Sequence, residues 1–195
     1  MENYKKNLEL LTKNHVYSKE MEHDACGVGL IASTEGKKSR AIVEYGIEAL
    51  KAVWHRGAVD ADGKTGDGAG IHVEIPKDFF IEKIQVTGHD YDNSEICVGM
   101  IFLPRNDYSA QESCKTIVES ELTKNNFSIY GWRQVPVNSK VLGEKALQTM
   151  PEIIQVLFKP NDPNLLDKNL ERKIYEIRKR IENKAFDASL NNFYI

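Results

Sequence analysis

The chain has 195 residues, a formal net charge of −3 at pH 7 and 28% charged residues, so it can form one domain or part of a larger one but has no basic excess for binding nucleic acid. It contains no apolar run near the roughly 18 residues of a membrane-spanning helix, and residues 1–15 lack the apolar segment of a secretory signal. Its three cysteines include no close pair, which is typical of a reducing compartment, so we expect a cytoplasmic protein.

The first part of the chain predicts one strand and one helix after a polar leader. Residues 1–22 are polar and charged, and we expect them to be poorly anchored. Residues 28–32 (VGLIA) predict a buried strand, and residues 34–38 predict a turn. Apolar residues recur every three or four positions over residues 40–54, which predicts an amphipathic helix. Its packed face would consist of Ile42, Val43, Gly46, Ile47, Leu50, Val53 and Trp54.

The middle of the chain combines a glycine-rich segment with two predicted strands and a helix. Residues 55–70 (HRGAVDADGKTGDGAG) contain five glycines, and residues 71–75 (IHVEI) alternate as a half-buried strand does before Pro76 ends it. Residues 96–103 (ICVGMIFL) predict a continuous apolar strand. Residues 109–112 (SAQE) predict the capping box of a helix. That helix would bury Cys114, Ile117, Val118 and Leu122.

The last third predicts two more strands, residues 127–137 and 153–158, and a highly charged helix over residues 165–181. Strands and helices mix without regular alternation, so we expect an α+β fold with largely antiparallel sheets. Residues 192–195 (NFYI) look like the first residues of a further strand. We therefore expect a domain truncated at its C-terminal end, where missing partner strands would leave an unpaired sheet edge.

Cys26 differs from the other two cysteines in its surroundings. Cys97 lies within a predicted apolar strand and Cys114 on a predicted helix face, so both fit small buried hydrophobes. Cys26 is followed closely by Gly27 and Gly29, which remove side chains from the backbone around the sulfur and would let a substrate approach. This pattern makes Cys26 the candidate nucleophile.

A nucleophilic cysteine needs a base, because a free thiol has a pKa of about 8.5 and is mostly protonated at neutral pH. His23 lies three residues upstream, on the leader. If the bond between Ala25 and Cys26 were cleaved, the α-amine of Cys26, with a pKa of roughly 7.7 to 8, could take the thiol proton. A positioned base contributes about 10² to 10⁴ in rate, so cleavage would decide whether the site works.

Several short blocks occur in order along the chain and together resemble a known family. They are CGVGLIA from Cys26, HRGA from His55, DAD from Asp60, TGDGAGI from Thr65, and GWR from Gly131 followed by Val135 and Pro136. The set resembles the N-terminal part of the class II glutamine amidotransferase (glutaminase) domain in the large chains of glutamate synthases. The resemblance runs from about residue 22 to the last residue.

The resemblance implies a fold, a reaction and a set of cofactors. The fold is the N-terminal-nucleophile hydrolase αββα sandwich, with residues 1–25 as a propeptide and residues 26–195 as an incomplete amidotransferase domain. Cys26 would attack the side-chain amide of L-glutamine to give a glutamyl thioester and ammonia, and water would then release L-glutamate. The ammonia would be channelled to a downstream synthase domain that uses 2-oxoglutarate. FMN and an iron–sulfur cluster are implied for the full-length parent, with a small subunit or ferredoxin as electron donor, and no cofactor is implied within this segment.

The resemblance also carries over to two further residues. Arg56 matches an arginine that other class II amidotransferases have near the cysteine, where it would support the active-site loop. Asp67 resembles an aspartate in the same neighbourhood. The two lie closer together in those relatives, so residues 58–66 look like an insertion typical of the synthases. A purely structural ion pair or turn is the competing interpretation for both residues.

Two blocks of the family are absent from these residues. One resembles S-R-F-S-T-N and holds the glutamine carboxylate, and the other resembles H-N-G-E and builds the oxyanion hole. Asn125 and Asn126 are followed by Phe127 rather than by glycine. Losing one oxyanion donor typically costs about 10² to 10³ in rate. We therefore expect the 195-residue chain alone to be inactive and its parent to be a glutaminase.

Other functions are weighed against this one. Residues 58–65 (AVDADGKT) satisfy a loose phosphate-loop spelling, but they follow a predicted helix instead of a strand, and their aspartates would repel phosphates. Asp60, Asp62 and Asp67 lack the spacing of a calcium loop. A non-catalytic, truncated amidotransferase-like module stays open, as does another class II amidotransferase acting on a sugar phosphate or phosphoribosyl acceptor.

Overall fold

The computed structural model describes residues 6, 13 and 27–195, with the side chain of Arg56 excepted. The predicted leader and Cys26 therefore lie outside the described residues. The chain divides into two compact units, Met1–Ala58 with Asp67–Ile71, and Val59–Gly66 with His72–Ile195. In the described part of the chain, none of the helices combines the length and apolar character of a membrane span.

The first unit contains the predicted amphipathic helix, α2 (Arg40–Ala52). Ser39 caps it, because the Ser39 side chain accepts a hydrogen bond from the backbone N–H of Ala41. Most of the predicted apolar face is half-buried, which confirms the periodicity. Trp54 is the exception at 78% exposed, because the helix ends at Ala52 and Trp54 begins the 3₁₀ turn η1 (Trp54–Arg56).

Two strands predicted in the first half of the chain are wrong. Residues 28–32 and 71–75 form no strand, and Val28 and Leu30 are 94% and 90% exposed. A strand exists only where its backbone groups pair with a neighbour, and neither segment has a paired strand among the described residues. Their apolar patterns indicate a capacity for burial but do not supply that neighbour.

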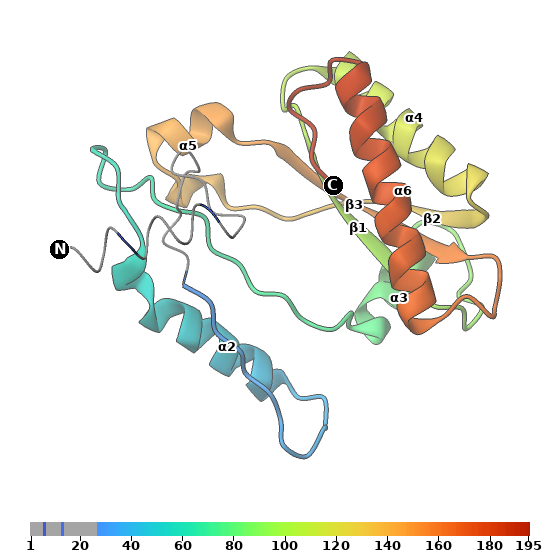
Figure 1. Ribbon diagram of the computed structural model, residues 1–195, viewed down its shortest axis with the longest axis horizontal. Coiled ribbons are helices and arrows are strands. Elements are labelled where there is room, and N and C mark those ends of the chain that lie inside the picture. The colour runs from blue at the N-terminus through green and yellow to red at the C-terminus, as the bar shows by residue number, and fades with distance from the viewer. Residues whose placement is uncertain (1–5, 7–12, 14–26) are drawn as a thin grey trace. The chain divides into compact units, whose positions relative to one another are not determined.

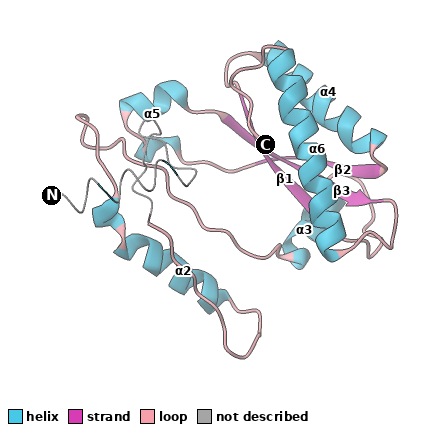
Figure 2. Ribbon diagram, in the orientation of Figure 1, coloured by secondary structure: helices cyan, strands magenta, loops and turns pink. Residues whose placement is uncertain are grey.

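The second unit is built on a three-stranded antiparallel sheet in the order β1-β3-β2 (Figure 2). The strands are β1 (Cys97–Leu103), β2 (Phe127–Gln134) and β3 (Glu152–Pro160). They confirm the three strands predicted for this part of the chain. Because β3 is central and covered on both faces, its middle residues Val156, Leu157 and Phe158 are all buried.

Helices α4 (Tyr108–Lys124) and α6 (Asp167–Asp187) lie side by side over one face of the sheet (Figure 1). Cys114, Val118 and Leu122 of α4 are buried as predicted, and Ile117 is half-buried. The predicted cap at Ser109 is wrong. Asp107 is the N-cap and accepts a hydrogen bond from the Ala110 N–H at 2.9 Å, so Ser109 lies inside the helix.

The opposite face of the sheet is covered by α3 (Lys77–Val86), a helix that the sequence analysis did not predict. Phe80 and Ile84 lie one turn apart and are buried against Tyr130 and Leu157. The four-residue spacing of these two apolar residues is compatible with a helix, but the charged residues between and around them make the amphipathic pattern too weak to predict one. A second short helix, α5 (Glu144–Thr149), and the 3₁₀ turn η2 (Ser139–Val141) were also missed.

Gly131 of the GWR block has a structural reason to be glycine. It lies at an irregularity in β2 with φ of 151°, which favours glycine. A Cβ placed there would lie 2.7 Å from Thr87 Cγ2, and Thr87 Oγ1 lies 2.8 Å from the carbonyl oxygen of Tyr130. The glycine therefore allows the chain after α3 to approach the sheet closely.

The predicted strand at residues 192–195 appears as a single antiparallel bridge on the outer edge of β1. The N–H of Phe102 donates to the Tyr194 carbonyl at 2.9 Å, and the N–H of Tyr194 donates back at 3.1 Å. In the described part of the chain, the fold is thus an antiparallel sheet with helices on both faces. The α+β prediction is confirmed at this level.

Asp92 ties the segment after α3 to the sheet. Its Oδ1 accepts hydrogen bonds from the Tyr130 hydroxyl at 3.0 Å and the Ser94 N–H at 3.3 Å, and its Oδ2 forms an ion pair with Lys159. The Lys159 contact, with these hydrogen bonds, holds the pKa of Asp92 well below its usual range. Burial and the Asp92 carboxylate raise the pKa of Tyr130.

We expect Asp92→Asn to lower the melting temperature at pH 7. A carboxyl group whose pKa is depressed by folding stabilises the fold above its unfolded pKa of about 3.9, and this contribution is lost as the pH falls below that value. The difference in melting temperature between wild type and variant should therefore shrink as the pH is lowered from 7 towards about 3. Asp90→Asn, at an exposed position with no interaction among the described residues, is the control. A pH-independent difference would contradict the prediction.

Candidate functional site

The structure describes the three predicted site residues to different extents. Cys26 lies outside the described residues. Arg56 is placed by its backbone in η1, and Asp67 is described in full. The geometry of the candidate site therefore comes from the chain on either side of Arg56 and from Asp67.

Asp67 fastens the end of the turn that carries Arg56. Its Oδ2 accepts a hydrogen bond from the backbone N–H of Ala58 at 2.8 Å, and its own N–H donates to the Ala58 carbonyl at 3.3 Å. The N–H of Gly57 donates to the Trp54 carbonyl at 3.0 Å and closes the turn. Asp67 thus holds the backbone two residues after Arg56, which is the kind of contact that could support an active-site loop.

The residues between Ala58 and Asp67 form a β-hairpin. Val59 and Gly66 make an antiparallel bridge, and the N–H of Asp60 donates to the Thr65 carbonyl at 2.7 Å. Gly63 has φ of 68° at the tip, where its N–H donates to the Asp60 carbonyl at 2.9 Å. The segment that resembles an insertion is therefore an ordered element with its own hydrogen bonds.

The Asp62 side chain stabilises the tip of this hairpin by hydrogen bonds to the residues that follow it. Its carboxylate accepts hydrogen bonds from the Thr65 hydroxyl at 2.5 Å and from the backbone N–H groups of Thr65 and Lys64 at 2.7 and 2.9 Å. These donors, with the Thr65 hydroxyl the strongest, hold the pKa of Asp62 well below its usual range. The carboxylate is fully engaged by the hairpin itself.

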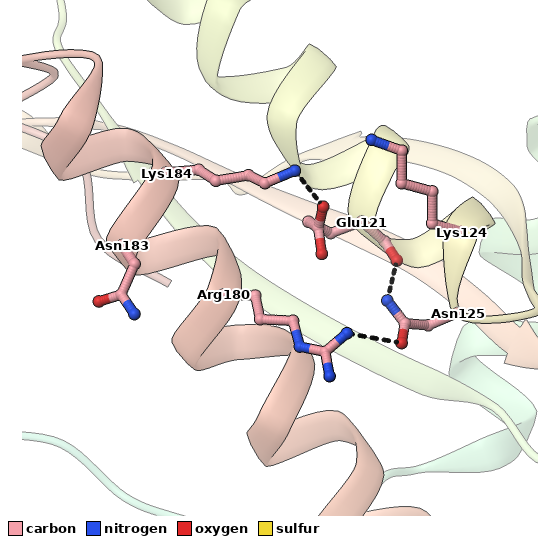
Figure 3. Close-up of a pocket in the computed structure, with 6 residues that line it drawn as sticks. All are labelled: Glu121, Lys124, Asn125, Arg180, Asn183 and Lys184. Atoms are coloured by element: carbon pink, nitrogen blue, oxygen red, sulfur yellow. Dashed lines mark hydrogen bonds and ion pairs between the residues drawn. The ribbon is translucent and has the colours of Figure 1, made fainter.

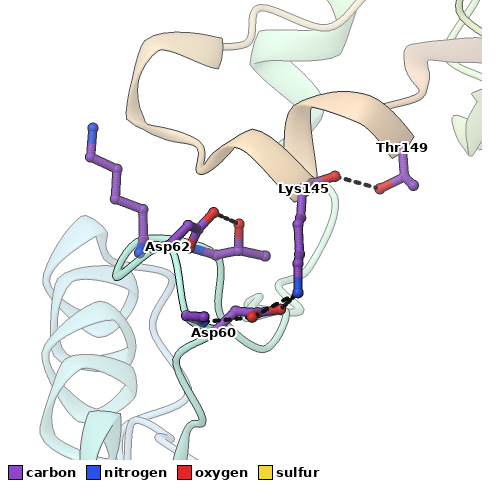
Figure 4. Close-up of polar contacts among 7 residues, drawn as sticks. Asp60, Asp62, Lys145 and Thr149 are labelled. Atoms are coloured by element: carbon purple, nitrogen blue, oxygen red, sulfur yellow. Dashed lines mark hydrogen bonds and ion pairs between the residues drawn. The ribbon is translucent and has the colours of Figure 1, made fainter.

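The hairpin tip also contacts the beginning of α5 (Figure 4). Lys145 Nζ lies 2.8 Å from Asp60 Oδ1 and 2.6 Å from Asp60 Oδ2. Gly143, which precedes α5, lies against Thr65 and Asp62. Gly143 and Lys145 could not be predicted as contacts of the hairpin, since nothing in their local sequence distinguishes them.

The structure bears on two alternative functions of residues 58–67, a phosphate-binding loop and a metal site. A phosphate-binding loop connects a strand to a helix, whereas residues 58–65 belong to a hairpin, so the context that nucleotide binding requires is missing. For metals, residues 27–195 and the two described leader residues contain no group of three or more His, Cys, Asp or Glu side chains that could hold an ion.

Cys97 and Cys114 are buried free thiols, as predicted. Burial raises the pKa of Cys97 to about 12, and burial likewise raises the pKa of Cys114. A thiol that stays protonated is a poor nucleophile. Of the two described cysteines, neither is therefore suited to covalent catalysis.

A shallow hollow between α4 and α6 is lined by Glu121, Lys124, Asn125, Arg180, Asn183 and Lys184 (Figure 3). Several of its polar groups bond to one another: Lys184 pairs with the buried Glu121, and Asn125 Nδ2 donates to the Glu121 carbonyl at 2.8 Å. Arg180 reaches Asn125 Oδ1 at 3.4 Å. None of the predicted site residues lines this hollow, and its contacts join the two helices.

Residues 26–195 match the protein family described as glutamine amidotransferases class-II. The chain belongs to the class II glutamine amidotransferase family. The match begins at Cys26, the residue that the sequence analysis selects as nucleophile. It also includes the Arg56 turn, the hairpin and the whole of the described sheet.

Individual class II amidotransferases similar to this chain are glutamate synthases. The chain is 52% identical to the glutamate synthase [NADPH] large chain of Azospirillum brasilense, over 98% of this chain and 13% of that protein. It is 40% identical to the ferredoxin-dependent glutamate synthase of Pyropia yezoensis, over 89% of this chain and 11% of that protein. It is 36% identical to the glutamate synthase [NADH] of Saccharomyces cerevisiae, over 92% and 9% respectively. The chain thus spans 13% or less of the length of these relatives.

We expect Asp67→Ala to loosen the turn after Arg56, because the Ala58 N–H loses its acceptor. A hydrogen bond of this kind contributes about 0.5 to 1.5 kcal/mol, so the Ala58 amide should exchange roughly three to ten times faster in hydrogen-exchange measurements. Asp67→Asn keeps a side-chain oxygen and should show a smaller increase. Glu48→Ala, an exposed change on α2, serves as control, and unchanged Ala58 exchange in Asp67→Ala would contradict the assignment.

Proposed function

We propose that this chain is the first part of the glutaminase domain of a glutamate synthase. In the parent protein, by which we mean the longer chain proposed here, the domain hydrolyses L-glutamine to L-glutamate and ammonia. The observation that carries this proposal is the class II amidotransferase match that starts at Cys26. The 52% identity to a glutamate synthase large chain favours this member of the family over amidotransferases with other acceptors.

The proposed mechanism uses two groups of one residue. Removal of residues 1–25 gives Cys26 a free α-amine, whose pKa of roughly 7.7 to 8 lets it accept the thiol proton near neutral pH. The thiolate attacks the side-chain amide carbon of glutamine, and the protonated amine returns the proton to the departing nitrogen, which leaves as ammonia. Water, deprotonated by the same amine, then breaks the thioester and releases glutamate.

Arg56 and Asp67 act as supporting residues in this proposal. The hydrogen bond from Ala58 to Asp67 and the closed turn from Trp54 to Gly57 give the segment around Arg56 a defined backbone. Such fixed backbone matters because catalysis depends on reacting groups being held in position before the reaction begins. Neither residue is assigned a contact with glutamine.

We further propose that the described sheet is one layer of a four-layer αββα sandwich. The sheet and the layer of α4 and α6 correspond to one αβ half of such a fold. α3 covers only part of the other face of the sheet, since Met100 of β1 is 41% exposed, and a second sheet could pack beside α3.

The ammonia is proposed to pass to a synthase domain of the parent that acts on 2-oxoglutarate. The similar glutamate synthases are named for NADPH, NADH and ferredoxin, so the similarity leaves the electron donor open. FMN and an iron–sulfur cluster are proposed for other parts of the parent. The free thiols also agree with the proposed cytoplasmic location.

We expect Cys26→Ala and Cys26→Ser to abolish glutamine hydrolysis by the parent protein, since the attacking sulfur is lost. Ammonia released from glutamine is the measurement. Cys114→Ala, which removes a sulfur buried between α4 and the sheet, should retain activity in the folded protein. Cys26 variants that hydrolyse glutamine at the wild-type rate would overturn the proposed function.

Mass spectrometry of the active parent protein should find Cys26 as its first residue. The reason is that only a cleaved chain has an α-amine at the nucleophile, and an amide nitrogen has no comparable basicity. An active protein that still begins at Met1 would contradict the proposed base.

The 195-residue chain alone, processed to Cys26, should not hydrolyse glutamine measurably. It lacks the blocks that would hold the substrate carboxylate and the oxyanion, and the loss of one oxyanion donor typically costs about 10² to 10³ in rate. Ammonia release by the isolated chain, compared with the parent at equal concentration, checks this. Equal rates would mean that the missing blocks are dispensable.

A further inference from the structure

The hairpin of residues 58–67 is fixed at both ends. At its base, Asp67 and Ala58 exchange the two hydrogen bonds described above. At its tip, Asp60 and Asp62 contact Gly143 and Lys145, which follow some 80 residues later in the chain. An insertion that only filled space would need neither connection.

Gly143 shows that the contact at the tip is one of shape as well as charge. Its φ of −74° and ψ of 165° are open to any residue, so its backbone gives no reason for glycine. A Cβ at this position would lie 2.6 Å from the backbone nitrogen of Thr65 and closer still to Thr65 Oγ1 and Asp62 Oδ2. The missing side chain is therefore explained by the hairpin that occupies its space.

Lys145 adds a directional contact to this close approach. Its ammonium group lies within 2.8 Å of both carboxylate oxygens of Asp60. The start of α5 thus meets the tip of the hairpin through the Lys145 side chain and through Gly143.

The hairpin is hydrogen-bonded from its tip to its base. Asp62 binds three donors of its own turn, and the Asp60–Thr65 and Val59–Gly66 pairs continue the ladder to Ala58 and Asp67. The hydrogen bonds that begin at the tip therefore end at Asp67, which holds the turn after Arg56. A misplacement of about 1 Å far from the reacting atoms can cost about 10² in rate.

We propose that Gly143, Lys145 and Asp60 are positioning residues of the glutaminase, which hold the hairpin so that Asp67 keeps the Arg56 turn in place. This inference rests on the proposed function. It gives the insertion a role, the pre-organisation of the glutamine site, and assigns that role to residues outside the blocks that resemble the family.

The main test is Gly143→Ala in the parent protein. The added methyl group would overlap Thr65 and Asp62 and so disturb the contact at the tip, and we expect kcat for glutamine hydrolysis to fall about ten-fold. KM for glutamine should change less than about two-fold, since none of the three residues is assigned a substrate contact. Glu144→Ala, the next residue in the chain, adds no atom towards the hairpin and should leave both constants unchanged.

Lys145→Met provides a second variant in case Gly143→Ala does not fold. We expect a fall of about three-fold in kcat, recovery in Lys145→Arg, and recovery in the charge-reversed pair Asp60→Lys with Lys145→Asp. Lys64→Met removes an exposed lysine of the hairpin itself that makes no side-chain contact among the described residues, and it should behave as wild type.

Hydrogen exchange separates positioning from general destabilisation. Faster exchange confined to residues 58–67 together with reduced kcat supports the inference, whereas equally faster exchange throughout β1, β2 and β3 overturns it. A wild-type parent that hydrolyses glutamine while Gly143→Ala and Lys145→Met keep full kcat overturns the inference alone. A folded and processed wild-type parent without glutaminase activity overturns the proposed function and this role with it.

Discussion

The second unit depends on the pairing of β3 with a strand on each side. The backbone groups of β3 pair with β1 from Glu152 to Phe158 and with β2 from Ile154 to Pro160. Only this pairing creates the two apolar faces that α4 and α6 on one side and α3 on the other can cover. Each fully buried Val, Leu, Ile or Phe side chain contributes about 1.5 to 3 kcal/mol, so the sheet and the helices stabilise one another.

The same requirement explains how much of the fold could be predicted from the sequence. Residues 96–103 and 153–158 are apolar and lie beside partners, so pattern and structure agree. Residues 28–32 and 71–75 carry equally good patterns but have no partner strand among the described residues, and they stay largely exposed. The local pattern of apolar residues shows which side chains favour burial, while strand formation needs a neighbouring strand that only the tertiary structure supplies.

The start of helix α4 was predicted wrongly for a related reason. Asp107 and Ser109 can both cap a helix by their chemistry. The tertiary structure favours the earlier start, because Gln111 Nε2 donates to the Pro104 carbonyl at 2.8 Å.

The residues of the candidate site could be predicted from the sequence, but most of the contacts between them could not. Chemistry alone distinguished Cys26 from two cysteines that are buried, and resemblance supplied Arg56 and Asp67. The hydrogen bond between Asp67 and Ala58 joins residues nine positions apart. It forms only because the hairpin brings these two residues together, and the sequence did not predict that hairpin. Lys145 and Asp60 are 85 positions apart, and no periodicity or spacing connects residues at that distance.

Gly143 shows why a glycine with ordinary backbone angles can be more informative than one with a positive φ. At Gly63, φ of 68° already explains the residue, so no neighbour need be invoked. At Gly143 the angles suit any residue, and groups of Thr65 and Asp62 occupy the space that a side chain would need. The exposed Asp60–Lys145 pair contributes about 0.2 to 1 kcal/mol by general experience, which is too little to fix a hairpin alone. Close packing at Gly143 supplies the tighter constraint, because a methyl group there would lie 2.6 Å from the backbone nitrogen of Thr65, whereas the ion pair can stretch by small side-chain rotations.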